Sequence, residues 1–378
     1  MRLKTDWILF LTILAMTGFG LVMVYSASSA VAELRYQVPP YYFVVRQLGW
    51  AAFSLCVLMS LKRVDYRRLN TPAWAFSGLG IVVVLLVAVY FADSRAHRWF
   101  HIAGLGSLQP SEFAKPALIL FLAYFISRHL QTINQPSTLK QGAIAVAMLA
   151  GIVVLSDLGT ALVPVITAVI VFWVAGLRTR YLAWVAVVGL MLCTLAVVSK
   201  GYRLGRIIAY IDPDYSKIEL IDTHGWVRAY VQSSTTVRDA SYQPRQSKIA
   251  VGTGGVLGVG LMQGKQKLFL PDAHTDFIYA TVGEELGLWG ATAVLAGFVM
   301  ILWRGARLFV LASDPFGRYL ALGATVSILL QALINMSVVL DMAPTKGFPL
   351  PMISLGGSSL LSSLVSLGML MSVSEHEG

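Results

Sequence analysis

The stretch LPDAHTDFIYATVGEELGLWG, residues 270–290, places acidic side chains directly before and inside a long apolar run. Asp276 stands at the boundary, where a carboxylate is partly dehydrated, and dehydration raises the pKa of an acid. A raised pKa suits a general base that works near neutral pH. Asp276 is therefore the candidate catalytic residue, with His274 as a second candidate in a less fixed position. The alternative is that Asp276 only caps the helix that begins at TDF, because Asp is a good capping residue.

Two further acids, Glu284 and Glu285, lie deeper in the same apolar run. Consecutive residues of a helix point about 100° apart, so these two side chains are not expected to face one cavity. We expect one of them to pair with a cation in the helix bundle and the other to mark a helix-packing contact. Neither is given a catalytic role.

Basic residues occur in segments where the topology of the chain disfavours them. Arg98, Lys115 and Lys346 lie against apolar or Gly/Pro-rich segments on the side that carries few cations. An anionic substrate is the simplest reason for positive charge in such places. Ordinary solvated loop charge is the better interpretation of three others: Arg95, Lys217 and Arg238.

The motif QPSEFAKP, residues 109–116, carries Glu112 and Lys115 at the start of a helix. A spacing of three puts both side chains on one helix face, where they can pair. Charges within a membrane span are costly and usually line a cavity or a site, but a structural ion pair that locks two helices explains them equally well. Asp157, in the motif SDLGT, has the same two interpretations: it caps the following span, or it faces the same cavity.

The elements that must position these residues are membrane helices. Of the 378 residues, 57% are hydrophobic and only 13% are charged, whereas soluble domains carry about 25% charged residues. The apolar residues form long runs, which predicts an all-α integral membrane protein. The net charge of +10 is better matched to anionic lipid and membrane topology than to nucleic acid. The sequence contains no zinc-ligand spacing, P-loop, nucleophile elbow or dinucleotide fingerprint.

Ten apolar runs predict about ten transmembrane helices, the first of them a retained signal anchor. They cover residues 7–25, 47–61, 72–92, 112–127, 142–157, 160–176, 181–199, 277–303, 318–340 and 356–373. Alternate loops are basic, which by the positive-inside rule makes them cytoplasmic, together with both termini. The largest outer loop, about residues 200–276, separates the seventh and eighth spans and is too long for a simple connector. Its stretch 235–271 is rich in glycine and cations, and we expect an amphipathic or re-entrant piece there.

Several motifs together resemble one protein family. They are MVYSASS, RQLGW, QPSEFAK, DLGT, QSKIAVGTGG, LPDAHTDFIYATVGEELG and GFPLPMISLGGSSL, and they follow one another in family order across nearly the whole chain. The sequence is similar to the SEDS family of bacterial cell-wall polymerases, which includes FtsW and RodA. The resemblance implies a single polytopic domain over residues 1–378 in the bacterial cytoplasmic membrane. It also implies that the chain polymerises lipid II into glycan strands.

The resemblance assigns roles to the candidate residues. Asp276, in the HTDF motif, is the family's catalytic aspartate, and it would take the proton of the acceptor GlcNAc 4-hydroxyl. The bond from the donor MurNAc C1 to its undecaprenyl pyrophosphate would break at the same time. Substrate-binding residues would be those already noted: Arg98, Glu112, Lys115, Asp157, His274 and Lys346. Mg²⁺ or Mn²⁺ could assist, although no dedicated metal cluster is visible in the sequence.

The family also implies partners and leaves alternatives open. A class B penicillin-binding protein, which is a transpeptidase, would bind the chain together with other divisome or elongasome membrane proteins. APTKGFPLPMISLGGSSL, which contains Lys346, favours the division branch typified by FtsW. Asp272, and SLGG in place of SYGG, depart from that pattern. The alternatives are a RodA-type polymerase that controls cell shape, a lipid II flippase, and a non-enzymatic scaffold.

Overall fold

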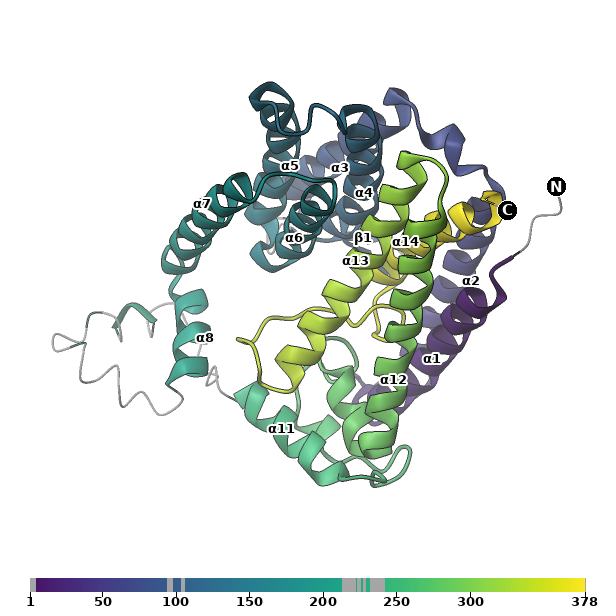
Figure 1. Cartoon of the computed structure of the whole chain (residues 1–378). Coiled ribbons are helices and arrows are strands. Elements are labelled where there is room, and N and C mark those ends of the chain that lie inside the picture. The colour runs from purple at the N-terminus through teal and green to yellow at the C-terminus, as the bar shows by residue number, and fades with distance from the viewer. Residues whose placement is uncertain are drawn as a thin grey trace.

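The computed structural model describes residues 5–93, 98–102, 106–212, 222, 226, 229–231 and 242–377. This part of the chain forms a helical bundle with one short β-hairpin (Figure 1). Its first half contains α1 (Trp7–Tyr36), α2 (Tyr42–Arg63), η1 (Tyr66–Leu69), α3 (Pro72–Ala92), β1 (Phe100–Ile102), β2 (Gly106–Leu108), α4 (Pro110–His129), α5 (Pro136–Ser156) and α6 (Leu158–Val174). The second half contains α7 (Thr179–Val198), α8 (Gly201–Ile211), α11 (Tyr242–Gly254), η2 (Gln266–Leu268), α12 (Ile278–Leu311), α13 (Pro315–Val339) and α14 (Gly357–His376).

The predicted spans correspond to ten long helices among the described residues, which confirms the all-α membrane fold. Eight of these helices are long and apolar enough to cross a membrane. The other two are α6, which is shorter, and α4, which carries Glu112 and Lys115. The first and eighth spans run further than predicted, to Tyr36 and Leu311. The predicted spans end at the first polar or charged residues, whereas a helix continues beyond the hydrocarbon into the wet interface.

Capping side chains fix where several helices begin. The backbone N–H of Leu9 donates to the Asp6 carboxylate at 3.1 Å at the start of α1. The N–H of Gly317 donates to Asp314 at 3.0 Å at the start of α13. Proline occupies the first turn of α3, α4, α5 and α13, where its missing N–H costs nothing. The local sequence therefore accounts for the starts of these five helices.

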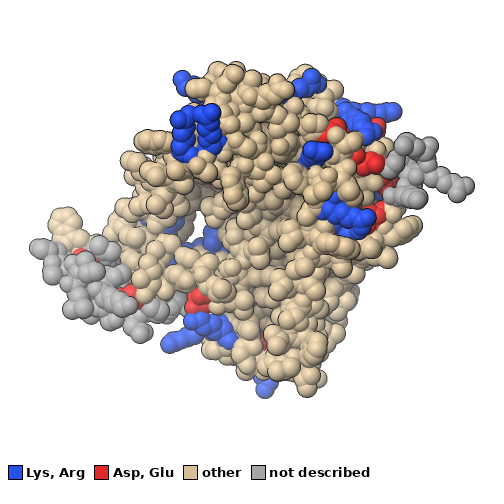
Figure 2. Space-filling model, in the orientation of Figure 1, with Lys and Arg blue, Asp and Glu red and all other residues tan. Residues whose placement is uncertain are grey.

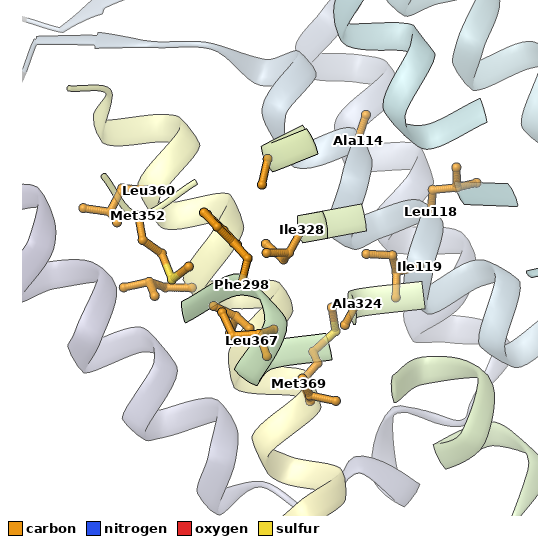
Figure 3. Close-up of a cluster of buried hydrophobic side chains, with 14 of the residues drawn as sticks. Ala114, Leu118, Ile119, Phe298, Ala324, Ile328, Met352, Leu360, Leu367 and Met369 are labelled. Carbon is orange, nitrogen blue, oxygen red and sulfur yellow. The ribbon is translucent and has the colours of Figure 1, made fainter. Parts of the chain in front are cut away.

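The core of the bundle is formed by α4, α13 and α14. Helix α13 packs against α4, α12 and α14, and α2 packs along α14. Figure 3 shows the apolar side chains that meet there, among them Ala114, Leu118 and Ile119 of α4, Ala324 and Ile328 of α13, and Leu360 and Leu367 of α14. Because α4 is enclosed on most sides, Glu112 and Lys115 in its first two turns are shielded from lipid by protein.

Helix α7 stands apart from this core. It touches α6 and α8, and none of its residues is buried in the described structure. Figure 1 shows α7 and α8 as an arm beside the bundle, and Figure 2 shows the surface hollowed between that arm and the bundle, with basic side chains in the hollow. The arm leaves one side of the bundle open next to the loop that follows α13.

Helix α12 is broken near its N-terminal end, and a loop supplies hydrogen-bond partners at the break. Gly287 has a φ of 63°, a left-handed conformation that glycine adopts without steric cost. The N–H of Leu288 donates to the carbonyl of Gly255 at 3.0 Å instead of continuing the helix. In exchange, Val259 N–H donates to the Glu284 carbonyl at 3.0 Å. The loop after α11 thus provides hydrogen-bond partners for backbone groups that the break leaves without an intrahelical partner. It packs against α12 as a fixed part of the structure.

The opposite end of the bundle is closed by ion pairs. Lys62 pairs with Glu375 at 2.8 Å, and the Thr5 hydroxyl donates to the same carboxylate at 2.8 Å. Arg304 donates to Asp6 at 2.7 Å. These contacts bring both ends of the described chain to the basic loops that follow α2 and α12.

Candidate active site

Asp276 lies in the turn before α12, beneath the loop between α13 and α14. The Asn335 side chain of α13 donates to the backbone oxygen of Asp276 at 2.7 Å and to the carbonyl of Phe348 at 2.5 Å. A Cβ added to Gly347 would collide with the Asp276 carboxylate, so only glycine allows this close approach. The capping alternative is wrong, because the cap position is Phe277 and no side chain caps this helix. The carboxylate therefore faces the α13–α14 loop.

The surroundings of Asp276 alter its acidity. Burial, followed by the negative charge of Asp272, raises its pKa from 3.8 to about 7, against the opposing charge of Lys346. A carboxylate with a pKa near 7 is a much stronger base than an ordinary aspartate, and about half of it is still ionised at neutral pH. This is the acidity expected from the sequence for a residue at the membrane boundary.

Hydrogen bonds join the turn of Asp276 to the loop above it. The Ser354 hydroxyl donates to the carbonyl of Thr275 at 2.5 Å and accepts from the Leu350 N–H at 2.8 Å. The Leu355 N–H donates to the His274 carbonyl at 3.0 Å. The two loops therefore form one support, and Asp276 has little freedom to move relative to Gly347.

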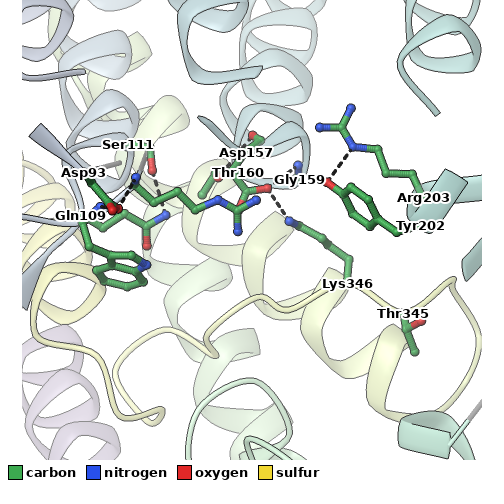
Figure 4. A network of polar contacts seen from close by, with 12 residues as sticks. Asp93, Gln109, Ser111, Asp157, Gly159, Thr160, Tyr202, Arg203, Thr345 and Lys346 are labelled. Atoms are coloured by element: carbon green, nitrogen blue, oxygen red, sulfur yellow. Dashed lines mark hydrogen bonds and ion pairs between the residues drawn. The ribbon is translucent and has the colours of Figure 1, made fainter. Parts of the chain in front are cut away.

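A cluster of opposite charges includes Lys346 of the same loop (Figure 4). Lys346 donates to the Asp157 carboxylate, and Arg98 pairs with Asp157 at 3.4 Å. Asp157 also accepts the Gly159 N–H at 2.9 Å as the N-cap of α6, which confirms the capping interpretation of this residue. Its place in a cavity shared with Glu112 and Lys115 stays a prediction. Burial opposes ionisation of Asp157, but the charges of Lys346 and Arg98 outweigh it and hold its pKa below the usual value. We call Asp157, Lys346 and Arg98 the outer charge cluster.

Contacts of backbone groups help to place both Arg98 and Lys346 next to Asp157. The Asp93 carboxylate, just after α3, accepts the N–H of Arg98 at 3.0 Å and that of Trp99 at 3.2 Å. The methylenes of Lys346 lie over Gly159, where an added Cβ would collide with them. Segments distant in the sequence thus meet at one carboxylate.

Glu112 and Lys115 form a second, sealed cluster. Lys115 donates to Glu112 at 2.7 Å and to the Gln331 side chain of α13. Gln331 in turn donates to the Pro349 carbonyl at 2.7 Å. The pair therefore acts as a structural lock between α4 and α13, and it reaches the loop of Lys346 only through Gln331.

His274 faces away from the outer charge cluster. Its ring packs against Phe43 with centroids 5.2 Å apart. Burial, the largest influence, lowers its pKa, and its Nδ1 has no hydrogen-bond partner within the described part of the chain. Its backbone oxygen supports the site, whereas its ring stays a candidate only. Three predicted loop cations lie outside the described residues: Arg95, Lys217 and Arg238.

We expected one of Glu284 and Glu285 to pair with a cation and the other to mark a helix-packing contact, and the first of these expectations is confirmed. Glu285 pairs with Lys267 at 2.8 Å, as expected for one of them. Glu284, however, accepts the N–H groups of Lys265 at 2.7 Å and Gln266 at 3.0 Å, in the same loop. The loop that contains residues 265–267 folds around this part of α12. The two carboxylates point in different directions from the helix, but both contact this loop.

Some supporting residues were not recognised in the sequence. Asn335 and Gln331 lie one turn apart on α13 and hold Phe348 and Pro349, as described above. Two amides at a spacing of four on an otherwise apolar span were the available signal. Arg206 of α8 donates to the Thr345 carbonyl at 3.5 Å, and its charge also opposes the raised pKa of Asp276.

The described residues contain no group of three or more His, Cys, Asp or Glu side chains that could hold a metal ion. Of the nearby acids, Asp157 already binds two cationic side chains and Asp276 lies beside Lys346. This donor set does not fit a tightly held divalent ion, and no step is assigned to one.

Comparisons with known proteins agree with this architecture. The sequence matches the family described as Cell cycle protein, that of FtsW, RodA and SpoVE, over residues 6–378. A probable peptidoglycan glycosyltransferase FtsW of Geobacter metallireducens is 38% identical over 377 residues, covering 98% of this chain and 95% of that protein. A chain of a peptidoglycan synthase complex, solved to describe the structural coordination of polymerization and crosslinking, superposes with a TM-score of 0.75 at 25% identity over 99% of both chains. The rod shape determining protein RodA of Thermus thermophilus shares the fold, with a TM-score of 0.68 at 24% identity over 98% of this chain and 97% of that one.

Proposed function

The chain belongs to the family of the FtsW, RodA and SpoVE cell cycle proteins, and we propose that it is a peptidoglycan glycosyltransferase. It polymerises lipid II into glycan strands at the outer face of the bacterial cytoplasmic membrane, during septal wall synthesis. The observation that carries this proposal is the pairing of a weakly acidic carboxylate, Asp276, with an open cluster of cations across one glycine-containing loop.

In the proposed reaction Asp276 removes the proton from the acceptor 4-hydroxyl as that oxygen forms a bond to donor C1. The bond between C1 and the pyrophosphate oxygen breaks, and its electron pair leaves with the lipid-linked pyrophosphate. Lys346 and Arg98 lie where they can stabilise this developing negative charge. Fixed charges of this kind act without reorganisation during the reaction.

In this proposal Glu112, Lys115 and His274 hold the elements that carry the site in position. Glu112 and Lys115 hold α4 against α13, and Gln331 transmits that position to the loop at Pro349. The His274 backbone oxygen accepts the Leu355 N–H and so holds the end of the α13–α14 loop in place. None of the three residues needs to touch the reacting atoms.

We further propose that the end closed by Lys62–Glu375 and Arg304–Asp6 is cytoplasmic, together with both termini. The basic loops that the positive-inside rule assigns to the cytoplasm meet there. A class B penicillin-binding protein is the proposed membrane partner, because a chain of similar fold belongs to a peptidoglycan synthase complex.

The test is polymerisation of fluorescent lipid II by the purified full chain with its transpeptidase partner, read as strand length on a gel. Polymer supports the proposal. Movement of lipid II across vesicles without polymer would identify a flippase, and neither result would identify a scaffold. Depletion of the chain in its own cells distinguishes the division branch, which gives filaments, from the elongation branch, which gives round cells.

A further inference from the structure

Asp157 occupies a place that resembles a binding site for an anion. Its carboxylate receives an ammonium group from Lys346, a guanidinium from Arg98 and a backbone N–H at the first turn of α6. Helix N-termini and charge-assisted hydrogen bonds of this kind are typical of phosphate sites. Here the anion that fills the site is a side chain of the protein itself.

The three side chains of this cluster differ in how much of their surface is exposed to solvent. The Asp157 side chain is 9% exposed, whereas those of Lys346 and Arg98 are 27% and 32% exposed. The cations are therefore held by a buried carboxylate, while part of each cationic side chain remains exposed. An incoming phosphate group can reach both cations at these exposed parts.

We propose that Asp157 competes with the pyrophosphate group for Lys346 and Arg98, and so hastens release of the lipid pyrophosphate product. This inference rests on the proposed glycosyl transfer and goes beyond it, because it concerns the step after the sugar bond has formed. Asp157 touches no reacting atom in this scheme and is a positioning residue. It takes back the two cations when the product leaves.

The physical reason lies in the balance between binding and release. Two cations beside a helix N-terminus, with no acid near them, would hold a diphosphate tightly, and tight binding of a product limits turnover. A fixed carboxylate within ion-pair distance weakens that hold without removing it. Reciprocally, the cations that contact the ligand are the same ones that keep Asp157 ionised, so the competing charge is present at neutral pH.

The experiment compares Asp157→Asn with the wild-type full chain. Asn caps a helix about as well as Asp, so α6 keeps its start while the competing charge is lost. Binding of inorganic pyrophosphate at equilibrium is expected to tighten about tenfold, or about 1.4 kcal/mol. With enzyme in excess over labelled lipid II, the first sugar bond should form within about twofold of the wild-type rate, because chemistry precedes release. Steady-state polymerisation should fall about tenfold, in proportion to the slower release.

Asp341→Asn is the matched control. Asp341 lies at the start of the same loop and pairs with Lys248 at 2.5 Å, away from Lys346. Its φ of 55° is a conformation that Asn also tolerates. This variant loses one outer acid, as Asp157→Asn does, but its pyrophosphate affinity and its burst should match the wild type.

Two results would overturn the competition. Asp157→Asn protein that binds pyrophosphate as weakly as the wild type, or more weakly, would mean that the carboxylate only holds the cations in place. A first turnover as slow as the steady state would place Asp157 in the chemistry instead. If Asp157→Asn does not fold, Asp157→Ser keeps a capping oxygen and serves the same comparison. Because the binding measurement needs no turnover, a wild-type chain that binds pyrophosphate in this way but makes no polymer would count against the proposed function alone.

Discussion

The outer charge cluster and the Glu112–Lys115 pair contain the same chemical groups in different surroundings. In the outer cluster, cations from two loops meet Asp157, and the side chains of Lys346 and Arg98 are 27% and 32% exposed. In the inner pair the two side chains, both on α4, are 2% and 6% exposed, and a second helix, α13, supplies Gln331 to complete the contact. The first cluster is open to solvent, as the proposed exchange of Asp157 for a ligand requires, whereas the second is sealed.

This difference shows how one membrane protein uses charge for two purposes. A sealed pair stabilises only as long as both partners remain, because an unpaired buried charge is costly. An open pair contributes little to stability, since water and a ligand can replace either partner. Mutations should therefore separate the two clusters into one that controls folding and one that controls turnover.

The largest effect is expected at Asp276, which the outer cluster serves. Asp276→Asn should lower polymerisation by about 10²–10⁴-fold, because a general base is removed while size and shape are kept. Folded yield and partner binding should not fall, which a gel-filtration profile of the co-purified complex will check. Strands made at the wild-type rate and length would remove Asp276 from the mechanism.

The next largest effect is expected at the sealed pair and concerns stability. Lys115→Ala leaves Glu112 buried and unpaired, and it should lower the free energy of unfolding by about 3–5 kcal/mol. Thermal unfolding in detergent and membrane yield are the measurements. The double variant Glu112→Gln, Lys115→Met should recover most of the loss, since it leaves no buried charge. A fully stable Lys115→Ala protein would contradict the distinction between the clusters.

Lys346→Ala tests the outer charge cluster. In contrast to Lys115→Ala, it should lower activity and leave stability nearly unchanged. Polymerisation should slow by about 10²-fold, the typical effect of removing one group that stabilises developing charge, while thermal stability stays near that of the wild type. Lys248→Ala is the control, because it removes an exposed cation that pairs with the same loop. It should change neither quantity. Full activity of Lys346→Ala would make this residue an ordinary loop charge.

The smallest expected effect is a pH dependence of the polymerisation rate. It comes from Asp276, beside the outer cluster, and not from the Glu112–Lys115 pair. Because burial raises the pKa of Asp276 to about 7, the base becomes protonated below neutral pH. Initial rates should then fall about tenfold per pH unit on the acid side. An acid with a raised folded-state pKa favours folding only while it is protonated, so its contribution is lost as pH rises from about 4 to about 7. Asp276→Asn should therefore gain stability relative to the wild type over that range, and an unchanged difference would speak against the burial of this carboxylate.

Sequence reasoning reached the fold because its signals are local. Apolar runs set the spans, and residues such as Asp6, Asp314 and the helix-starting prolines set their beginnings. The site was reached only in part. Asp276 and Lys346 could be placed on one side of the membrane, but nothing in the sequence indicated that both cations would meet Asp157, which lies 189 residues from Lys346.

The acids of α12 show a second limit. The expectation for Glu284 and Glu285 assumed a regular helix with nothing wrapped around it. The left-handed Gly287 and the loop that inserts its own hydrogen bonds at Gly255 and Val259 change what the two side chains meet. Such an exchange depends on two segments fitting together in space, and each segment alone has an ordinary sequence.

The isolation of α7 has a consequence for how this sequence can vary between lineages. A helix whose neighbours are mostly lipid is constrained only to remain apolar, so Leu, Ile, Val and Phe are interchangeable along it. Helix α14 is constrained by shape at nearly every position, and an added Cβ at Gly357 would strike the Trp50 ring. Over evolutionary time α7 should therefore drift quickly and α14 slowly, although both carry the same transmembrane signature.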